Sequence, residues 1–458
     1  MKSTTAELTD ILLRRGEPAY EDARLDAIWN GRTTRREPAA IVRARSVEDV
    51  QAAVRLAARE GLQVGIRSGG HSFVASGLRQ DALLLDLSAL DSLQIDADRG
   101  VARVQPGVRA GAANAALDAR GLTFPVGHYP TVGLGGFLIG GGYGWNSRKL
   151  GPAALSIVAV DVVLADGSLV HADDETHPDL MWAVRGAGPG FFGVVVCYHL
   201  RTYPAYTQVL RSSMVYPETM RDEVLAWSYE ALPETSRSLE IAGKVGWSTE
   251  YDRPTTSLIG VGFCQDETAD EIYEVFESAP FRKHALAVVD RAPSSIAQLH
   301  AVAEVGMPQG NRYALDGVWT SAPIDRILAA GGGTMSSIPT PSSFLFWMLW
   351  GGYPIRDDAC WSTQGTLYFS PNAVWTDPAD DLRLESWAHS SLDAFADIDE
   401  GAQFSDANPA DRPAKGLEPA QAARLEDLRE TYDPDRRFVS YLQPHESTTA
   451  LGDHLRSR

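Results

Sequence analysis

Hydrophobic and polar positions in the first part of the chain alternate between a helical and a strand period. A capping-box pattern begins at Ser46. Helical spacing of the apolar residues then continues over 50–60 and ends at Gly61. A second helical pattern covers 110–121. Short apolar runs predict buried strands at 39–45, 62–66 and 82–87, and two more around a tight turn within 92–107. The alternation predicts a mixed α/β region, a beginning that many nucleotide-binding folds share.

The pattern changes near residues 203–205. Glycine-dense loops give way there to longer amphipathic and strand-like segments rich in aromatic residues, most of which we expect to pack a sheet core. The stretch Trp361–Phe369 alternates along its length and predicts a strand, one face of which would form the floor of a pocket. An acidic helical stretch over 417–435 predicts an element that closes the first domain.

The composition favours a globular cytoplasmic enzyme over a nucleic-acid-binding or membrane protein. At 458 residues the chain is too long for one ordinary core, so two or more domains are expected. A net charge of −19 disfavours phosphate backbones and anionic membranes, and no apolar run reaches membrane-spanning length. The N-terminus carries acidic residues and lacks the apolar region of a signal peptide. Three widely spaced cysteines are typical of buried thiols in a reducing compartment: Cys197, Cys264 and Cys360.

Two glycine-rich stretches predict loops that hold a phosphate-bearing ligand. The first, Ile66–Ser72 or "IRSGGHS", follows a predicted strand and places two adjacent glycines before a histidine. The second, Gly127–Gly151, interleaves its glycines with aliphatic and aromatic residues, which a flexible linker lacks. A packed loop whose backbone N–H groups face phosphates accounts for this composition better.

Two further patterns are similar to known ligand-binding motifs but lack the neighbouring elements or ligand residues that such sites need. Gly188–Gly193 has the spacing of a dinucleotide fingerprint, but a helical pattern precedes it and a strand-like run follows, the reverse of the order that an NAD site needs. The histidines form no close pair of ligand type, and His171–Asp179 is interpreted as a solvated loop. The sequence therefore predicts neither an NAD site nor a metal site.

Six ordered motifs resemble one family over nearly the whole chain. They are "IRSGGHS", "VQPGV", "GHYPTVGLGGFLIGGGYGWNSRKLG", "LADGSLVHA", "DLMWAVRGAGPGFFGVVV" and "YDPDRRF". The set resembles the berberine bridge enzyme-like branch of the vanillyl-alcohol oxidase and p-cresol methylhydroxylase flavoproteins. The resemblance implies an α+β fold, in which residues 1–205 and 408–458 form an FAD-binding domain of vanillyl-alcohol oxidase type. Residues 206–407 would form an inserted substrate domain, an antiparallel sheet covered by helices.

The same resemblance implies FAD bound covalently through His71. In the family the matching histidine bonds to the 8α carbon of the flavin, and a neutral imidazole is a competent nucleophile near neutral pH. Main-chain groups of the glycine loops would hold the diphosphate, and two residues of a later strand would lie by the adenine. The implied cofactor-binding residues besides His71 are Arg67, Ser68, Gly69, Gly70, Ser72, Thr131, Val132, Gly133, Gly135, Gly136, Gly140, Gly141, Gly142, Gly193 and Val195.

Three departures from the family pattern narrow the prediction. Many relatives carry a second flavin-linking cysteine where this chain has Tyr129, so we expect one covalent bond, as in 6-hydroxy-D-nicotine oxidase. An Asp-Asn pair is replaced by Leu155-Ser156, and a pair of asparagines by Tyr441 and Gln443. The cofactor prediction is unaffected, but an inherited list of catalytic residues does not carry over.

The implied reaction removes a hydride from an alcohol or amine carbon of a small substrate, which the flavin accepts at N5. The substrate must also lose a proton, and the candidates to receive it are Tyr129, His128 and Tyr441, each equally open to a structural role. The aromatic-rich insert and the acidic chain favour an aromatic or heterocyclic molecule over a polyanion.

The sequence leaves three alternatives for what happens to the electrons. An oxidase would pass electrons to oxygen and release hydrogen peroxide, a dehydrogenase would use a quinone or a protein acceptor, and a sensor or scaffold would bind flavin without turnover. In similar enzymes valine at the place of Val132 goes with oxidase behaviour and leucine with poor oxygen use, so an oxidase is favoured. The sequence predicts no oligomeric state.

Overall fold

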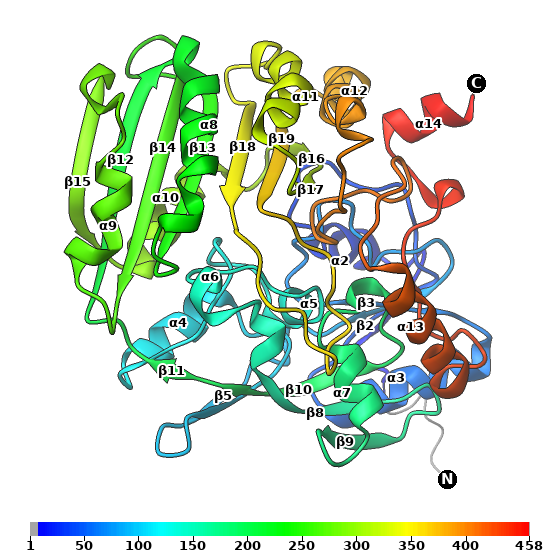
Figure 1. The fold of residues 1–458 in the computed structure, drawn as a ribbon. Helices are drawn as coiled ribbons and strands as arrows, with labels where there is room; N and C mark the ends of the chain where they lie inside the picture. Colours follow the sequence, from blue (N-terminus) through cyan, green and yellow to red (C-terminus); the bar gives the residue numbers. More distant parts are fainter. Residues whose placement is uncertain (1–7, 458) are drawn as a thin grey trace.

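A computed structural model describes residues 8–457, which build a four-stranded, a five-stranded and an eight-stranded sheet (Figure 1). In the first sheet, of order β1-β2-β4-β3, β1 is antiparallel to β2 and the other neighbours are parallel. Its strands are β1 (Leu12–Arg14), β2 (Ala40–Arg43), β3 (Val64–Arg67) and β4 (Leu83–Asp86). The last three lie at the predicted apolar runs and confirm those strands.

Helix α3 (Val47–Glu60) connects β2 to β3, as its pattern predicts. The Ser46 hydroxyl accepts a hydrogen bond from the Asp49 N–H at 3.2 Å, and Gly61 ends the helix with a left-handed φ of 67°. The capping is one-sided, because the Asp49 carboxylate accepts from the Arg45 N–H at 2.8 Å rather than from Ser46. The helix buries its alanine, valine and leucine face against the first sheet.

The second sheet is antiparallel and has the order β5-β6-β10-β8-β9. Its strands are β5 (Leu93–Asp96), β6 (Val101–Val104), β8 (Ile157–Val163), β9 (Leu169–Asp173) and β10 (Val194–Arg201). Residues of one face share a large core with three helices: α4 (Ala110–Asp118), α5 (Leu134–Ile139) and α7 (Pro178–Val184).

The segments around α7 bear on two interpretations. Helix α7 precedes Gly188–Gly193 and β10 follows it, which confirms that this motif lacks the context of a dinucleotide fingerprint. The solvated-loop interpretation of His171–Asp179 is wrong in part, because residues 171–173 pair with β8 as part of β9, and α7 begins at Pro178. Its composition is that of a loop, but pairing at the sheet edge determines the conformation.

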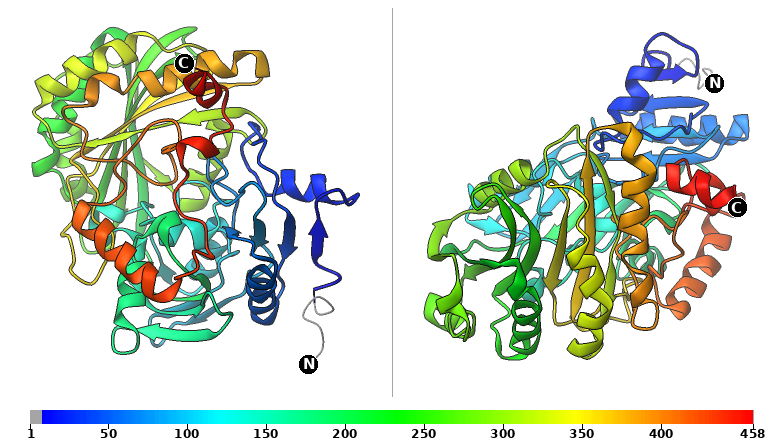
Figure 2. Two further views of the ribbon diagram at one scale, coloured as in Figure 1. Left: turned by 90° about the vertical axis from the view of Figure 1, so that its right-hand side faces the viewer. Right: turned by 90° about the horizontal axis from the view of Figure 1, so that it is seen from above.

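The third sheet runs β15-β12-β14-β13-β18-β19-β16, and β17 also pairs with β19. Its strands are β12 (Gln208–Pro217), β13 (Leu239–Ser248), β14 (Arg253–Cys264), β15 (Ala287–Ser294), β16 (Arg312–Leu315), β17 (Val318–Thr320), β18 (Phe344–Leu349) and β19 (Leu367–Trp375). One face is covered by α8 (Arg221–Glu230), α9 (Ala269–Glu277), α11 (Ile324–Ser336) and α12 (Asp381–Ser390), and the other faces the first two sheets (Figures 1 and 2). This arrangement confirms the predicted α+β fold with a helix-covered antiparallel sheet.

The strand predicted over Trp361–Phe369 is wrong for residues 361–366. Strand β19 begins only at Leu367, and all of its residues are buried. The Trp361 N–H donates to the Arg185 carbonyl at 2.8 Å, and the Gln364 side chain accepts from the Tyr353 N–H at 2.7 Å. These bonds hold a loop, so the alternation in the sequence does not separate two faces of a sheet.

The end of the chain returns to the first sheet. The predicted acidic helix is α13 (Pro419–Tyr432), and after it the Val64 N–H donates to the Arg437 carbonyl at 2.7 Å while the Val439 N–H donates to the Val64 carbonyl at 3.1 Å. Helix α14 (Ala450–Arg456) follows. These contacts fit the division of the chain after residues 205 and 407, which stays a prediction.

The remaining elements are short, except for α10 (Ile296–Gly306), which contacts α4. They are α2 (Tyr20–Asp26), β7 (Leu122–Thr123), α6 (Ser147–Leu150) and β11 (Tyr203–Pro204). Within residues 8–457, no helix combines the length and the apolar character needed to cross a membrane. Cys264 and Cys360 are buried free thiols, as predicted, whereas Cys197 is only half-buried.

Candidate active site

The two predicted glycine loops touch each other. The first follows β3 and the second leads into α5. A methyl group on Gly69 would lie 2.3 Å from the Gly133 nitrogen, and one on Gly133 would lie 2.5 Å from the Gly69 nitrogen. A methyl group on Gly135 would lie 2.4 Å from the Ser68 hydroxyl. Only glycine permits this approach, so the contact explains why both loops contain it.

The main chain of this contact region offers a row of hydrogen-bond donors. Among the described residues, the N–H groups of residues 68–73 find no acceptor. A methyl group on Gly136 would meet no atom within 4 Å, so open space adjoins the start of α5. Unpaired backbone donors beside open space suit the phosphates of a dinucleotide. The Arg67 guanidinium does not add to them, because it binds Asp86 at 2.9 Å and the Ala27 carbonyl at 3.2 Å.

His71 lies at the end of the first loop as a neutral, half-buried imidazole. Its Nε2 is 2.8 Å from the Thr131 hydroxyl, and its ring stacks on Trp29 at 5.0 Å between centroids. Burial, with the positive charges of Arg109 and Arg67, lowers the pKa of His71 to about 3. Nδ1 makes no hydrogen bond to another residue in the described part of the chain. In the tautomer that donates from Nε2 to the Thr131 hydroxyl, the Nδ1 lone pair is available for bond formation.

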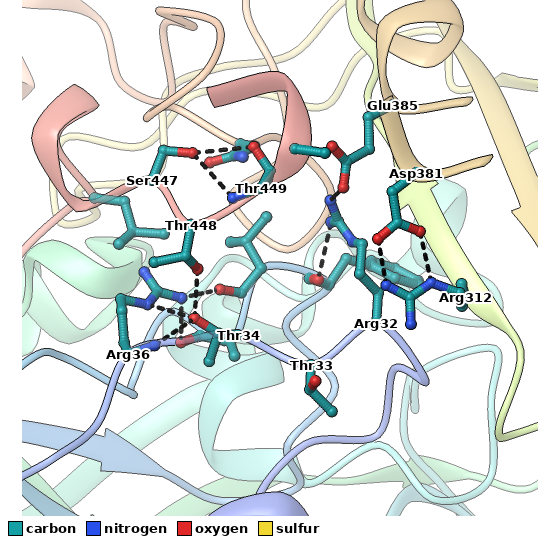
Figure 3. A pocket seen from close by; sticks show the side chains of 16 residues that line it. Arg32, Thr33, Thr34, Arg36, Arg312, Asp381, Glu385, Ser447, Thr448 and Thr449 are labelled. Carbon is teal, nitrogen blue, oxygen red and sulfur yellow. Dashed lines mark hydrogen bonds and ion pairs between the residues drawn. The ribbon is translucent and has the colours of Figure 1, made fainter. Parts of the chain in front are cut away.

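A polar cluster lines a small cavity together with residues 73–75, which follow His71 in the chain (Figure 3). The carbonyl of Phe73 accepts from the Asn30 amide at 3.0 Å, and the carbonyl of Ala75 accepts from the Arg36 guanidinium at 3.1 Å. Arg32 is paired with Glu385 at 2.6 Å. The cavity inside the cluster is about 50 Å³, and the hydrogen bonds of Asn30 and Arg36 hold residues 73–75 in place.

Tyr129 belongs to an aromatic cluster that joins the loops to the third sheet. Its ring lies 5.3 Å from Trp29 and 5.4 Å from His71. Tyr313 of β16 stacks on Trp29 at 5.1 Å, and Phe344 of β18 packs in the same cluster. Burial, with the nearby Glu304 carboxylate, raises the pKa of Tyr129. The phenol is therefore protonated at neutral pH and is available there as a hydrogen-bond donor.

His128 faces a carboxylate of the third sheet. Its Nε2 is 3.7 Å from the Glu240 carboxylate, and its ring meets Trp145 edge-on at 4.3 Å. Glu240 is fixed by a hydrogen bond from the Ser147 N–H at 3.2 Å. The distance is that of an ion pair and exceeds a hydrogen bond, so the carboxylate can stabilise a protonated His128, which makes His128 a candidate general base.

Lys244 is a half-buried amine on the same face of β13 as Glu240. Its Nζ lies 4.4 Å from the Phe344 ring centroid, and burial lowers the pKa of Lys244. Within residues 8–457 it forms no ion pair or hydrogen bond. A cationic group held without a carboxylate next to the aromatic cluster is available to a ligand.

Tyr441 occupies a separate position. Its hydroxyl donates to the Ala187 carbonyl at 2.7 Å, and its ring stacks on Phe404 at 5.2 Å. The described residues show no contact between Tyr441 and either His128 or Tyr129, so the structure does not bring the three candidates together.

The other predicted cofactor residues lie along the second loop and the start of β10. Gly141 and Gly142 have φ values of 102° and 75°, which other residues rarely adopt. Val132 is half-buried, and its Cγ1 would lie 3.6 Å from a methyl group on Gly127. The Ser72 hydroxyl accepts a hydrogen bond from the Ser76 N–H at 3.2 Å, and Gly140 ends α5. Gly193 and Val195 are both buried.

Glu240, Lys244, Trp29 and Tyr313 were not among the residues predicted from the sequence. The alternation of polar residues in β13 would have suggested the first two, since Glu240 and Lys244 stand four positions apart and share one face of a strand. Trp29 and Tyr313 carry no local signal, because their role arises from packing between distant segments.

Three comparisons relate the chain to known proteins. Residues 38–173 match the family described as FAD binding domain. FAD-linked oxidoreductase nodO from Hypoxylon pulicicidum is 30% identical over 96% of this chain and 98% of its own length. (R)-6-hydroxynicotine oxidase from Paenarthrobacter nicotinovorans is 33% identical over 48% of each chain. The crystal structure of 6-hydroxy-D-nicotine oxidase from Arthrobacter nicotinovorans superposes with a TM-score of 0.81 at 24% identity, covering 93% of this chain and 96% of its own.

Proposed function

Because this chain belongs to the berberine bridge enzyme-like FAD-linked oxidoreductases of the vanillyl-alcohol oxidase and p-cresol methylhydroxylase superfamily, we propose that it is an oxidase acting on a small aromatic or heterocyclic alcohol or amine. It would remove a hydride from the carbon that bears the oxygen or nitrogen and pass the electrons to oxygen, with release of hydrogen peroxide. The alternative is a dehydrogenase of the same fold that uses a quinone or a protein acceptor.

The observation that carries this proposal is His71, a neutral imidazole with an unpaired Nδ1 at the meeting point of the glycine loops and the aromatic cluster. We propose that Nδ1 is bonded to the 8α carbon of FAD. Backbone N–H groups of residues 68–73 and the start of α5 would hold the diphosphate. Bound FAD would supply the hydride acceptor.

His128 and Glu240 would handle the substrate proton. The imidazole would accept a proton from the substrate hydroxyl or amine, and the carboxylate at 3.7 Å would orient the ring and stabilise its charged form. Tyr129, protonated at neutral pH, would hydrogen-bond the substrate or the cofactor.

The side chains around this region support the proposed substrate class. Aromatic rings dominate the cluster around Tyr129, so a flat apolar body would pack well there. Lys244 adds one cationic donor beside Phe344 and would bind an oxygen or nitrogen acceptor on the ring. The name of (R)-6-hydroxynicotine oxidase gives a heterocyclic substrate for one relative.

The test is a screen of aromatic and heterocyclic alcohols and amines that follows bleaching of the flavin absorbance without oxygen. Air is then admitted, and hydrogen peroxide is measured. Bleaching followed by stoichiometric peroxide supports the oxidase. Bleaching that only a quinone or dye reverses supports the dehydrogenase, and a flavin that no substrate class bleaches overturns both.

Tyr129→Phe should lower kcat by about tenfold with little effect on folding, because it removes one hydroxyl that hydrogen-bonds in the reacting complex. The thermal unfolding midpoint should match that of the wild type. The control is Tyr251→Phe, a turn residue outside the cluster. The alkaline limb of the pH–rate profile decides whether Tyr129 accepts the substrate proton. If this limb differs between Tyr129→Phe and the wild type, the phenol, whose pKa is raised, is the proton acceptor. Unchanged rates at every pH would remove Tyr129 from the site.

Lys244→Met should raise KM by roughly ten- to a hundredfold and leave kcat nearly unchanged, because it removes a charge-assisted hydrogen bond made equally in the ground state and the transition state. Methionine keeps most of the apolar stem, so the packing on Phe344 survives. Lys283→Met, at an exposed lysine, serves as the matched control. Equal KM values in the two variants would exclude Lys244 from substrate binding.

A further inference from the structure

The second sheet carries a cluster of potential metal ligands on the face opposite its core. Asp161 of β8 pairs with His171 of β9, and His199 lies on the neighbouring strand β10. Figure 1 places β8, β9 and β10 at the lower side of the molecule, away from the third sheet. His171 and His199 follow Asp161 by 10 and 38 positions in the sequence, so only the strand register brings the three residues together.

Their ligand atoms converge on one point. One Asp161 oxygen is 2.7 Å from His171 Nδ1, the other is 3.3 Å from His199 Nε2, and the three ligand atoms all lie within 4.8 Å of one another. In a tetrahedral zinc site with bonds of 2.0 to 2.2 Å, neighbouring ligand atoms lie about 3.3 Å apart. The side chains therefore need only small rotations to surround an ion.

The surroundings suit an ion from solution. The His171 side chain is 49% exposed, whereas those of Asp161 and His199 are 22% and 19% exposed, so the point of convergence is reachable and its base is held by packing. His171 Nε2 lies 3.8 Å from the Asp173 carboxylate. A carboxylate on the second ring nitrogen orients a ligating histidine and raises its basicity.

We propose that Asp161, His171 and His199 form a binding site for a divalent transition-metal ion of the zinc, nickel or copper class. Two imidazoles and one carboxylate select these ions over magnesium and calcium, which prefer oxygen ligands alone. The site supplies three protein ligands and leaves further positions to water. The ion cross-links β8, β9 and β10 and takes no part in the flavin reaction.

Cys197 precedes His199 by two residues on β10 and pairs with Asp161 across the ladder. It is not one of the three residues whose ligand atoms converge. The proposal therefore assigns it no bond to the ion, and its substitution is a control.

Isothermal titration of the chelator-treated, flavin-containing protein with zinc chloride tests the proposal. One ion should bind per chain, and His171→Ala, His199→Gln and Asp161→Asn should each weaken binding at least tenfold. Cys197→Ser and His284→Ala, the latter at an exposed histidine of the third-sheet region, should bind as the wild type does. Zinc should also raise the thermal unfolding midpoint of the wild type and not that of His171→Ala.

A second measurement identifies the ligands directly. With one equivalent of copper(II), the electron paramagnetic resonance spectrum should contain coupling to nitrogen that is lost or altered in both histidine variants. An unchanged flavin spectrum and unfolding midpoint of the metal-free variants would establish that they fold. Three outcomes would each overturn the proposal and leave a hydrogen-bonded network. The ligand variants could bind zinc as tightly as His284→Ala does, zinc affinity could be lost only in Cys197→Ser, or magnesium could bind as tightly as zinc.

Discussion

His71→Ala should abolish the acid-stable attachment of flavin. Wild-type protein precipitated with acid should stay yellow, and a proteolytic peptide containing His71 should carry the flavin mass. In the variant all flavin should pass into the supernatant, because no other residue of the proposed site replaces the Nδ1 lone pair. The glycine loops and their N–H donors remain, so the variant should still bind FAD noncovalently before precipitation.

Loss of the bond should also slow reduction of the flavin by substrate. Removing the attached imidazole lowers the flavin potential, and each 30 mV costs about 1.4 kcal/mol of driving force, or roughly tenfold in the equilibrium constant. We therefore expect at least about a tenfold slower reduction in anaerobic rapid mixing. Since the pKa of His71 is lowered to about 3, its ring is neutral from mildly acidic to alkaline pH, and attachment should not vary over that range.

His284→Ala is the control for removing a histidine, since that residue is exposed and lies outside both glycine loops. Recovery of all wild-type flavin in the acid supernatant would refute the covalent bond while leaving FAD binding in place. A His71→Ala protein that retains acid-stable colour would move the attachment to another residue.

Val132→Leu should slow reoxidation of the reduced enzyme by air by about tenfold or more, with substrate reduction nearly unchanged. Val132 packs beside Gly127 and Phe137 at the start of the second glycine loop. One added methylene in a close-packed position fills a space the size of a diatomic molecule, and a tenfold loss corresponds to about 1.4 kcal/mol in the barrier.

The measurement is rapid mixing of substrate-reduced enzyme with oxygenated buffer, followed at the flavin absorbance. Val132→Ala completes the series, because it widens the space and should reoxidise at least as fast as the wild type. If all three proteins reoxidise at one rate, Val132 does not control oxygen access, and the preference for an oxidase over a dehydrogenase loses its main support.

The sequence by itself determined the local elements and indicated FAD as the cofactor. Ser46 and Gly61 mark the ends of α3, because a cap and a left-handed stop depend on neighbouring backbone groups. The glycines of both loops were recognisable because close main-chain approach excludes a side chain, and that requirement appears directly in the residue type. His71 was singled out because the motif around it resembles that of the family, and its covalent role stays a prediction.

Only the tertiary structure decided which distant side chains meet. Glu240 reaches His128, and Tyr313 reaches Trp29, because the third sheet packs over the loops. The alternation in Trp361–Phe369 was misleading, since a hydrogen bond to the Arg185 carbonyl and one from the Tyr353 N–H hold its first part as a loop. Asp161, His171 and His199 converge through strand register, which is fixed by the whole sheet. Local preferences contribute at most about 1 kcal/mol per residue, so packing between segments far apart in the chain overrides them wherever the two conflict.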